Sequence, residues 1–289
     1  MRLNKKGWQF VCITCILSLI PYYFIVVNGD SNTSWTLLLM WVPGLSAIIM
    51  RMVHKEGFLS GSVWNPLKDL KWLFMASFIP LAIEIASIVL TLGFDGAQLR
   101  PGFMTIENDL IALKGVAMIF GAGPQPWYVL LPNYLMSYFV GVLLYGLLFA
   151  FGEEYGWRGY LQKEWANNHQ LAGFVMIGVI WGLWHLPAIL MGHNYPEYPF
   201  LGGIILMPLL CVFFSISFGI AKNRKHVIWV AVLFHSGLNL SAEVSNSVLM
   251  EEGLNRPLND AIWTFLWAVT TAIIFSKRKD RIRVIKIGS

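Results

Sequence analysis

The sequence contains few charged residues and no long polar segment. Asp, Glu, Lys and Arg make up 13% of its 289 residues, whereas soluble globular proteins carry about 25%. Hydrophobic residues make up 56%, and the mean hydropathy is +0.60. One globular core cannot bury this much apolar surface, so lipid must cover a large part of it. The composition excludes an ordinary soluble protein and predicts an integral membrane protein.

Cysteine is scarce, and the basic residues form no continuous patch. The three cysteines, Cys12, Cys15 and Cys211, all lie inside apolar runs, which excludes a disulfide framework. We interpret Cys12 and Cys15 as small packing residues of a membrane helix. The formal net charge is +5, but the basic residues are divided among short blocks between apolar runs. We therefore expect no nucleic-acid partner and interpret these blocks as a signal of membrane topology.

Apolar segments long enough to cross a bilayer recur along the chain. A spanning helix needs about 20 mostly apolar residues. The segments that qualify are residues 8–27, 35–53, 72–93, 133–160, 172–191, 202–221, 228–245 and 261–276. This pattern predicts an all-α membrane protein, a bundle of about eight transmembrane helices that forms a single polytopic domain over residues 1–289.

The basic residues predict how the helices are oriented. If the N-terminus is cytoplasmic, 18 of the 21 Lys and Arg residues fall in cytoplasmic segments, and only Arg100, Lys114 and Arg256 lie on the opposite side. Because cytoplasmic loops are enriched in Lys and Arg, we expect both termini in the cytoplasm of a prokaryotic cell. The one long outer loop covers residues 94–126, and its moderately apolar piece, residues 110–120, is too short to span the membrane.

Several polar side chains lie inside the predicted membrane helices, where each is costly and requires a partner or a function. They are Glu84, Glu153, Glu154, Arg158, His185, His235, Asn239 and Glu243. The sequence assigns no role to Glu84. We expect Glu243 near the outer boundary of the bilayer.

Helical spacing groups these side chains into pairs. Glu154 and Arg158 are four residues apart with the acid first, the favourable order for an ion pair within a helix. Such a pair neutralises Glu154 and leaves the neighbouring Glu153 available as a base. His235 and Asn239 have the same spacing, so both should project from one helix face.

The residue types in this group suit hydrolysis. Trp181 precedes His185 by four residues, so its indole should lie beside the imidazole. A carboxylate, Glu153, together with His185 can hold and deprotonate a water molecule. His235 and Asn239 can donate hydrogen bonds to a developing oxyanion. Alternatively, one Glu and two His, here Glu153, His185 and His235, could bind zinc and activate its water. Both routes end in amide hydrolysis at a polar site, which we expect to be open to the cytoplasmic side. In the alternative, purely structural interpretation, these groups only form hydrogen bonds and ion pairs between helices.

Three motifs occur in order on the fourth, fifth and seventh predicted helices: Glu153-Glu154-x-x-x-Arg158, Trp181-x-x-x-His185 and His235-x-x-x-Asn239. They resemble the motifs of the CPBP family, the CAAX proteases and bacteriocin-processing proteins also called Abi. Within it, the chain looks similar to CAAX prenyl endopeptidases of the Ras-converting-enzyme type. The resemblance covers residues 134–243, which we interpret as the motif-bearing catalytic core.

The resemblance implies a role for each motif. It implies that Glu153 is the general base, that the second Glu and the Arg of the first motif support it, and that His185 helps to hold the water. It assigns His235 and Asn239 to oxyanion stabilisation. Many family members have Phe at the position of Trp181, so we expect a narrower substrate pocket here.

The resemblance also implies the cofactors and partners. Family members are commonly labelled metalloproteases, but a glutamate mechanism requires no cofactor. The chain has no His-Glu-x-x-His motif, so we favour the metal-free mechanism and keep zinc as the alternative. The implied partners are the bilayer and membrane-embedded or lipid-modified peptides, either prenylated CAAX-type or bacterial ones.

Three other functions compete with this hypothesis. The chain could be a non-catalytic membrane-binding or immunity protein that retains the same fold. It could be a proton-coupled transporter that uses Glu84, Glu153 and the histidines as a relay. A serine protease that uses Ser46 is disfavoured, because a serine in that apolar helix is more simply a small packing residue.

Overall fold

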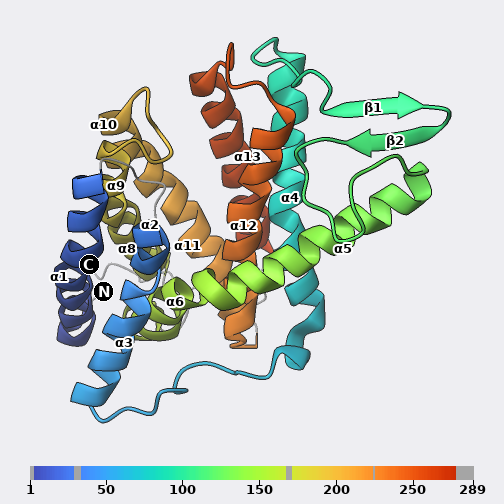
Figure 1. Ribbon diagram of the computed structural model, residues 1–289. Helices are drawn as coiled ribbons and strands as arrows, with labels where there is room; N and C mark the ends of the chain where they lie inside the picture. Colours follow the sequence, from blue (N-terminus) through green and yellow to red (C-terminus); the bar gives the residue numbers. More distant parts are fainter. Residues whose placement is uncertain (1–2, 29–33, 167–170, 224, 278–289) are drawn as a thin grey trace. The chain divides into compact units, whose positions relative to one another are not determined.

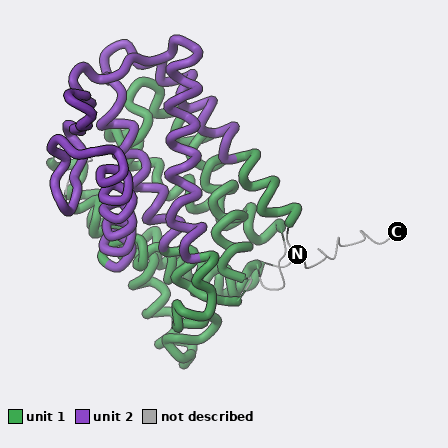
Figure 2. The backbone as a smooth tube through the Cα atoms, turned by 90° about the vertical axis from the view of Figure 1, so that its right-hand side faces the viewer, with its two compact units in different colours: residues 1–72, 148–232, 268–289 green, residues 73–147, 233–267 purple. Residues whose placement is uncertain are grey.

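The computed structural model describes residues 3–28, 34–166, 171–223 and 225–277. The chain divides into two compact units, coloured separately in Figure 2. Unit 1 comprises residues 1–72, 148–232 and 268–289, and unit 2 comprises residues 73–147 and 233–267. The basic residues of the tail beyond 277, which the topology prediction uses, lie outside the described residues.

All named secondary-structure elements in the described part of unit 1 are helices (Figure 1). Its elements are α1 (Lys5–Asn28), α2 (Ser34–Leu39), α3 (Val42–Val53), the 3₁₀ turn η1 (Pro66–Asp69), α6 (Phe151–Glu154), the π-helix η3 (Tyr155–Leu161), α7 (Gln162–Trp165), α8 (Leu171–Trp184), α9 (Leu186–Leu190), α10 (Pro199–Leu201), the π-helix η5 (Gly202–Leu206) and α11 (Met207–Asn223).

Unit 2 combines helices with one small hairpin. It holds most of α4 (Leu70–Gly93), β1 (Met104–Glu107), β2 (Leu110–Leu113), α5 (Trp127–Tyr145), and most of α12 (Ile228–Val248) and α13 (Arg256–Ser276). The π-helix η2 (Gly146–Ala150) follows α5, at the boundary between the two units.

The helices confirm an all-α membrane fold. Among the described residues, seven helical segments are long and apolar enough to span a bilayer: Lys5–Asn28, Ser34–Val53, Pro66–Gly93, Trp127–Trp165, Leu171–Leu190, Pro199–Asn223 and Arg256–Ser276. The remaining predicted span, residues 228–245, is also helical but is not among these seven, and it carries the polar residues of the third motif. The protein is therefore a multi-pass membrane protein.

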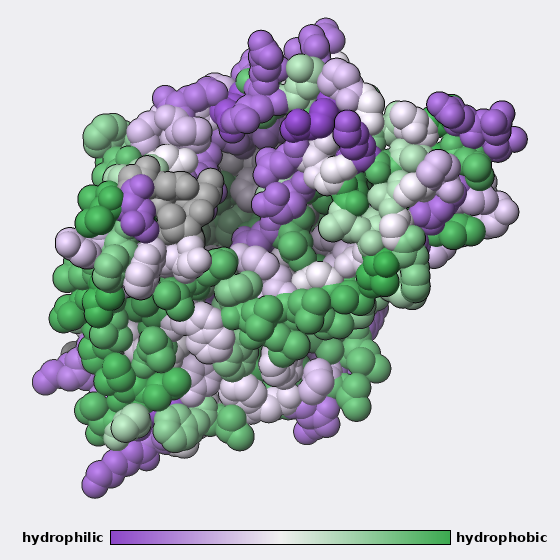
Figure 3. Space-filling view, in the orientation of Figure 1, coloured by the Kyte–Doolittle hydropathy of each residue, from purple (hydrophilic) through white to green (hydrophobic). Residues whose placement is uncertain are grey.

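Lipid-facing surface accounts for many of the exposed apolar side chains. In α1, Ile16, Leu19 and Ile20 are more than half exposed, and α5 exposes a similar row that includes Leu131 and Met136. Figure 3 shows apolar side chains gathered over both helices, while the tip of the hairpin is polar. A large exposed apolar surface of this kind is expected where lipid covers the protein.

Two glycines let α8 pack closely on α11 in unit 1. A Cβ atom on Gly178 would lie 2.4 Å from the Cα of Val212, and one on Gly182 would lie 2.3 Å from the Cα of Pro208. Only glycine fits at either position without moving a backbone. Small residues four apart are a common way for membrane helices to approach each other, and here they position the helix that carries the second motif.

Polar contacts join α4, α5, α12 and α13 in unit 2. The Tyr138 hydroxyl lies 3.0 Å from the carbonyl oxygens of both Ser77 and Gly237. The Trp263 indole donates a hydrogen bond of 2.9 Å to Glu84, a buried acid. The acid to which the sequence assigned no role therefore has a partner from the last helix.

The long loop between α4 and α5 contains a β-hairpin that the sequence analysis missed. β1 and β2 pair antiparallel, with Thr105 opposite Ala112. The two residues between the strands, Asn108 and Asp109, have φ angles of 49° and 64°. Two successive positive φ angles are typical of a type I′ turn, which suits the twist of a two-residue hairpin. The piece at residues 110–120 is thus partly strand, and an Asn-Asp pair between short apolar runs was the available signal.

An ion network joins the start of α1 to the end of the helical segment that carries the first motif. This segment comprises α6, η3 and α7, residues 151–165, and is called the motif-one helix below. Glu56 follows α3 and accepts hydrogen bonds of 2.7 Å from both Lys6 and Lys163. Partial burial raises the pKa of the Glu56 carboxyl, but the ammonium groups of Lys163 and Lys6 outweigh burial and lower the pKa to about 2. This carboxylate holds three separate parts of unit 1 together.

Acid should remove the contribution of this network to stability. Because the pKa of folded Glu56 lies below its ordinary value of 4.5, the contribution is complete above about pH 5 and is lost as the pH falls towards 2. We expect Glu56→Gln to lower the free energy of unfolding by about 1–2 kcal/mol at pH 7, since the lysines are partly solvated. Unfolding in detergent at pH 7 and pH 3 checks this, with the exposed Glu252→Gln as control. An equal loss at both pH values would contradict it.

Candidate active site

The first motif lies on a helix that alternates between α- and π-helical backbone. α6 carries Glu153 and Glu154 and stands between the π-helices η2 and η3. π-Helical turns are rare and often occur at functional sites. A Cβ atom on Gly152 would lie 2.7 Å from the carbonyl oxygen of Met40, so only glycine permits this approach to the junction of α2 and α3. Glu153 is thus held at a tight contact between backbones.

The Glu153 carboxylate is buried and receives two indole hydrogen bonds. Its side chain is 2% exposed. Trp181, on α8, donates to Oε2 at 2.6 Å, and Trp157, one turn further along the motif-one helix, donates to the same oxygen at 3.3 Å. Two donors on one oxygen orient the carboxylate and place partial positive charge beside it.

The ion pair predicted within the first motif is confirmed. Arg158 Nη1 lies 2.9 Å from Glu154 Oε1, and both side chains are at most 1% exposed. The guanidinium also lies over the indole of Trp181, 4.1 Å from the ring centre, and 5.2 Å from the ring centre of Phe218. Arg158 therefore connects the first motif to the aromatic residue of the second.

The second motif lies where α8 ends. The rings of Trp181 and His185 are 5.9 Å apart, which confirms that the two side chains are neighbours. His185 Nδ1 lies 2.8 Å from the carbonyl oxygen of Trp181. Because a carbonyl oxygen only accepts hydrogen bonds, Nδ1 must carry the proton, and Nε2 is the acceptor in the neutral ring. Pro187, which cannot continue a helical ladder, follows at the break between α8 and α9.

The third motif lies on α12, in unit 2. His235 is 4% exposed, and Asn239 is half-buried and donates a hydrogen bond of 3.2 Å to the hydroxyl of Tyr145. The structure thus brings together the five residues of the first two motifs within unit 1 and places the third motif on the other unit. The convergence of His235 and Asn239 on Glu153 stays a prediction.

The residues predicted to bind zinc belong to two different units. Catalytic zinc sites use about three protein ligands. Among the residues that the structure describes, no group of three or more His, Cys, Asp or Glu side chains could hold a metal ion. Unit 1 supplies Glu153 and His185, and the third predicted ligand, His235, belongs to unit 2. Use of zinc therefore stays a prediction.

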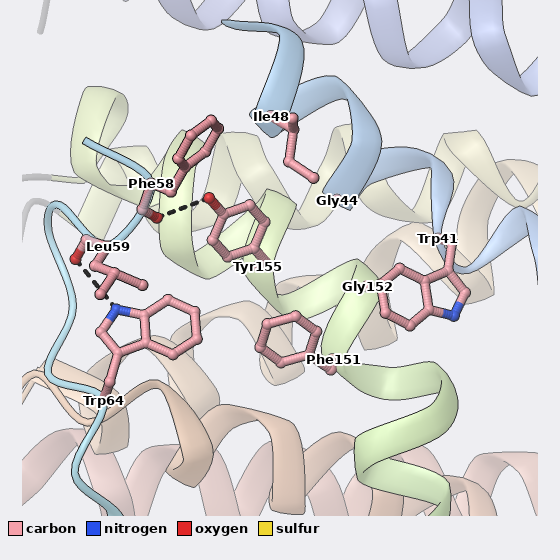
Figure 4. A pocket seen from close by; sticks show the side chains of 9 residues that line it. All are labelled: Trp41, Gly44, Ile48, Phe58, Leu59, Trp64, Phe151, Gly152 and Tyr155. Atoms are coloured by element: carbon pink, nitrogen blue, oxygen red, sulfur yellow. Dashed lines mark hydrogen bonds between the residues drawn. The ribbon is translucent and has the colours of Figure 1, made fainter. Parts of the chain in front are cut away.

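An apolar pocket of about 240 Å³ lies against the same helix (Figure 4). Its lining comes from α3 and the residue before it, the segment after α3 and the motif-one helix: Trp41, Gly44, Ile48, Phe58, Leu59, Trp64, Phe151, Gly152 and Tyr155. Phe151 and Tyr155 are each two residues from Glu153, about 200° around a helix. The pocket therefore lies on a different face of the helix from the carboxylate.

Trp157 is a residue of this site that the sequence analysis missed. Its indole donates to Glu153 across one helical turn. The spacing of four residues was the available signal, since it is the same spacing that identified the ion pair of Glu154 and Arg158.

Removing the Trp181 donor should lower activity. Trp181→Phe keeps a ring beside Arg158 but removes the 2.6 Å hydrogen bond to Glu153. Because this bond helps to orient the carboxylate, we expect kcat to fall by about 10- to 100-fold. Trp157→Phe, which removes the longer 3.3 Å bond, should lower kcat less. An equal kcat for wild type and Trp181→Phe would contradict this role.

Comparison with known proteins identifies a matching family and similar sequences. Residues 135–241 match the family described as type II CAAX prenyl endopeptidase Rce1-like. The chain is 30% identical over 151 residues to CAAX prenyl protease 2 of Methanococcus maripaludis, covering 49% of this chain and 51% of that protein. It is 26% identical over 185 residues to lysostaphin resistance protein A of Staphylococcus haemolyticus, covering 58% of this chain and 48% of that protein.

The chain spans about half the length of the curated relatives that it matches. The matched segment contains all three motifs and almost coincides with the predicted core at residues 134–243. Over this segment the chain is similar to the Rce1-like CAAX endopeptidases, which confirms the resemblance that the motifs predict.

Proposed function

We propose that the protein is an intramembrane endopeptidase that hydrolyses a peptide bond of a membrane-associated substrate. The observation that carries this proposal is the buried carboxylate of Glu153, oriented by two indole N–H groups. It lies in the segment that matches an endopeptidase family. A carboxylate buried inside a membrane helix is costly, so it supports the hypothesis of a functional site.

The chemistry proposed for the site begins with a water molecule. Glu153 takes a proton from the water as its oxygen attacks the carbonyl carbon of the scissile bond. His185 positions the water through Nε2, since Nδ1 is committed to the Trp181 carbonyl. His235 and Asn239 donate hydrogen bonds to the oxyanion. Glu153 then passes the proton to the leaving amine, so the peptide is cleaved with addition of one water.

The two relatives suggest one class of substrate and one alternative function. The name of the Methanococcus relative, CAAX prenyl protease 2, favours lipid-modified peptides of CAAX type. The name of the Staphylococcus relative, lysostaphin resistance protein A, favours a second candidate function, a role in resistance to lysostaphin. Under that alternative the protein acts by binding, and a variant without Glu153 keeps its biological effect.

One assay separates these proposals. Purified protein in lipid vesicles is incubated with a panel of prenylated and unprenylated peptides, and metal content is measured on the same samples. We expect cleavage by the wild type and none by Glu153→Gln. Stoichiometric zinc, with activity lost on chelation and restored by zinc, would favour the metal-dependent mechanism. Absence of cleavage across the panel together with a phenotype that survives Glu153→Gln would favour the binding function.

A further inference from the structure

Two buried cations in unit 1 have no part in the chemistry described above. Arg51 on α3 is 1% exposed, and Lys222 on α11 is 3% exposed. A buried charge is costly unless other groups compensate it. Among the described residues neither cation forms an ion pair with a carboxylate. Backbone carbonyls accept hydrogen bonds from both cations, and Arg51 also donates to the Ser60 hydroxyl.

Both cations donate to the π-helix of the first motif. Lys222 Nζ lies 3.3 Å from the carbonyl oxygen of Arg158, and Arg51 Nη2 lies 3.0 Å from that of Gly159. These are consecutive peptide groups in η3. Two cations from two other helices therefore hold the backbone at the position from which the Arg158 side chain emerges.

The same cations also hold the segment at residues 57–61. Arg51 donates to the carbonyl oxygens of Gly57 at 2.9 Å and Ser60 at 3.1 Å. Lys222 donates to the carbonyl oxygen of Gly61 at 3.1 Å. Each cation thus bridges this segment and η3, and its several carbonyl partners fix where it lies.

Aromatic contacts complete the attachment. The guanidinium of Arg51 lies 5.3 Å from the ring centre of Tyr155 and 5.4 Å from that of Tyr160, both on η3. The Tyr155 hydroxyl donates a hydrogen bond of 2.7 Å to the carbonyl oxygen of Phe58, drawn in Figure 4. Cation–π contacts away from water add to the stability of such a cluster.

We propose that Arg51 and Lys222 are positioning residues of the active site. The proposal rests on the proposed function. Lys222 holds the backbone of Arg158, the Arg158 side chain lies over Trp181, and Trp181 donates to Glu153. Loosening the first contact should misplace the carboxylate. A displacement of about 1 Å at a reacting group can reduce the rate about 100-fold.

The test uses substitutions that remove the charge and its donors. In the full-length protein, Lys222→Met and Arg51→Met should lower kcat per folded molecule by about 10- to 100-fold, with KM nearly unchanged. Lys222→Arg, which keeps a buried donor, should recover most of kcat. The matched control is Lys225→Met, because this exposed lysine also donates to a backbone carbonyl, that of Lys68 at 2.8 Å.

The readouts separate positioning from simple stability. If the cations only stabilised the fold, the Met variants would yield less folded protein with an unchanged kcat, and that result would overturn the proposal. So would a Lys222→Arg variant no better than Lys222→Met. If Lys222→Met does not fold, Lys222→Gln, which keeps N–H donors without charge, replaces it.

A second measurement does not depend on cleavage. Hydrogen exchange should accelerate in peptides that cover η3 in Lys222→Met but not in Lys225→Met. An unchanged exchange rate there would overturn the proposal even in an active protein. If wild type cleaves no peptide, the proposed function fails, whereas the exchange rates still report whether the two cations hold this helix.

Discussion

Glu153→Gln is expected to reduce peptide cleavage by about 10²- to 10⁴-fold, the usual contribution of a general base. The amide has nearly the shape of the carboxylate and can still accept hydrogen bonds from Trp181 and Trp157. It cannot take up a proton from water. The fold should therefore persist while the chemical step is lost, which gives a low kcat with little change in the thermal unfolding midpoint.

The matched control for this prediction is Glu243→Gln. Glu243 is an exposed acid on α12, the helix of the third motif, so its neutralisation should leave cleavage unchanged. Both variants are measured with the same peptide and normalised to the folded fraction. Full activity in Glu153→Gln would remove this carboxylate from the mechanism, and an equal loss in both variants would point to a nonspecific effect of charge.

Breaking the buried pair of Glu154 and Arg158 should destabilise unit 1 strongly. Arg158→Met leaves the Glu154 carboxylate, 0% exposed, without its 2.9 Å partner. Removing one member of a buried ion pair typically costs about 3–5 kcal/mol, because the remaining charge is uncompensated. The double variant Glu154→Gln, Arg158→Met removes both charges and should recover part of this loss. Unfolding in detergent, measured for the two single variants and the double variant, isolates the coupling.

The exposed pair of Arg256 and Glu251 provides the control. Its 2.6 Å contact is shorter than that of the buried pair, but the Glu251 side chain is 81% exposed. Solvent-exposed pairs contribute about 0–1 kcal/mol, so Arg256→Met should have a small effect. Similar losses for Arg158→Met and Arg256→Met would show that burial does not determine the strength of the pair.

Hydropathy and helical period were sufficient to predict the local features of this protein, namely its helices and the side-chain pairs within one helix. The apolar segments mark helices because a bilayer sets the length of a span whatever the neighbouring helices do. The pairs Glu154–Arg158 and Trp181–His185 follow from spacing alone, since residues four apart lie on the same helix face. Both pairs are found as neighbours. These features depend on the backbone of one helix.

Contacts between helices required the tertiary structure. The indole of Trp181 serves as a donor to Glu153 across 28 positions of sequence, whereas helical spacing predicted only that it lies beside His185. Lys222 is a second example, because it donates to the backbone carbonyl of Arg158, which lies 64 positions away in the sequence. Period and composition identify which face of a helix is polar, but the partner across the interface depends on close packing of side chains from distant parts of the chain.

Sequence by itself therefore determined the membrane class, the helices and the pairs within them, because these depend on local periodicity and on the thickness of lipid. Only the tertiary structure decided which groups surround Glu153 and what compensates the buried charges of Arg51 and Lys222. The physical reason is that a buried polar group must find a partner in three dimensions, and spacing along one helix does not specify that partner.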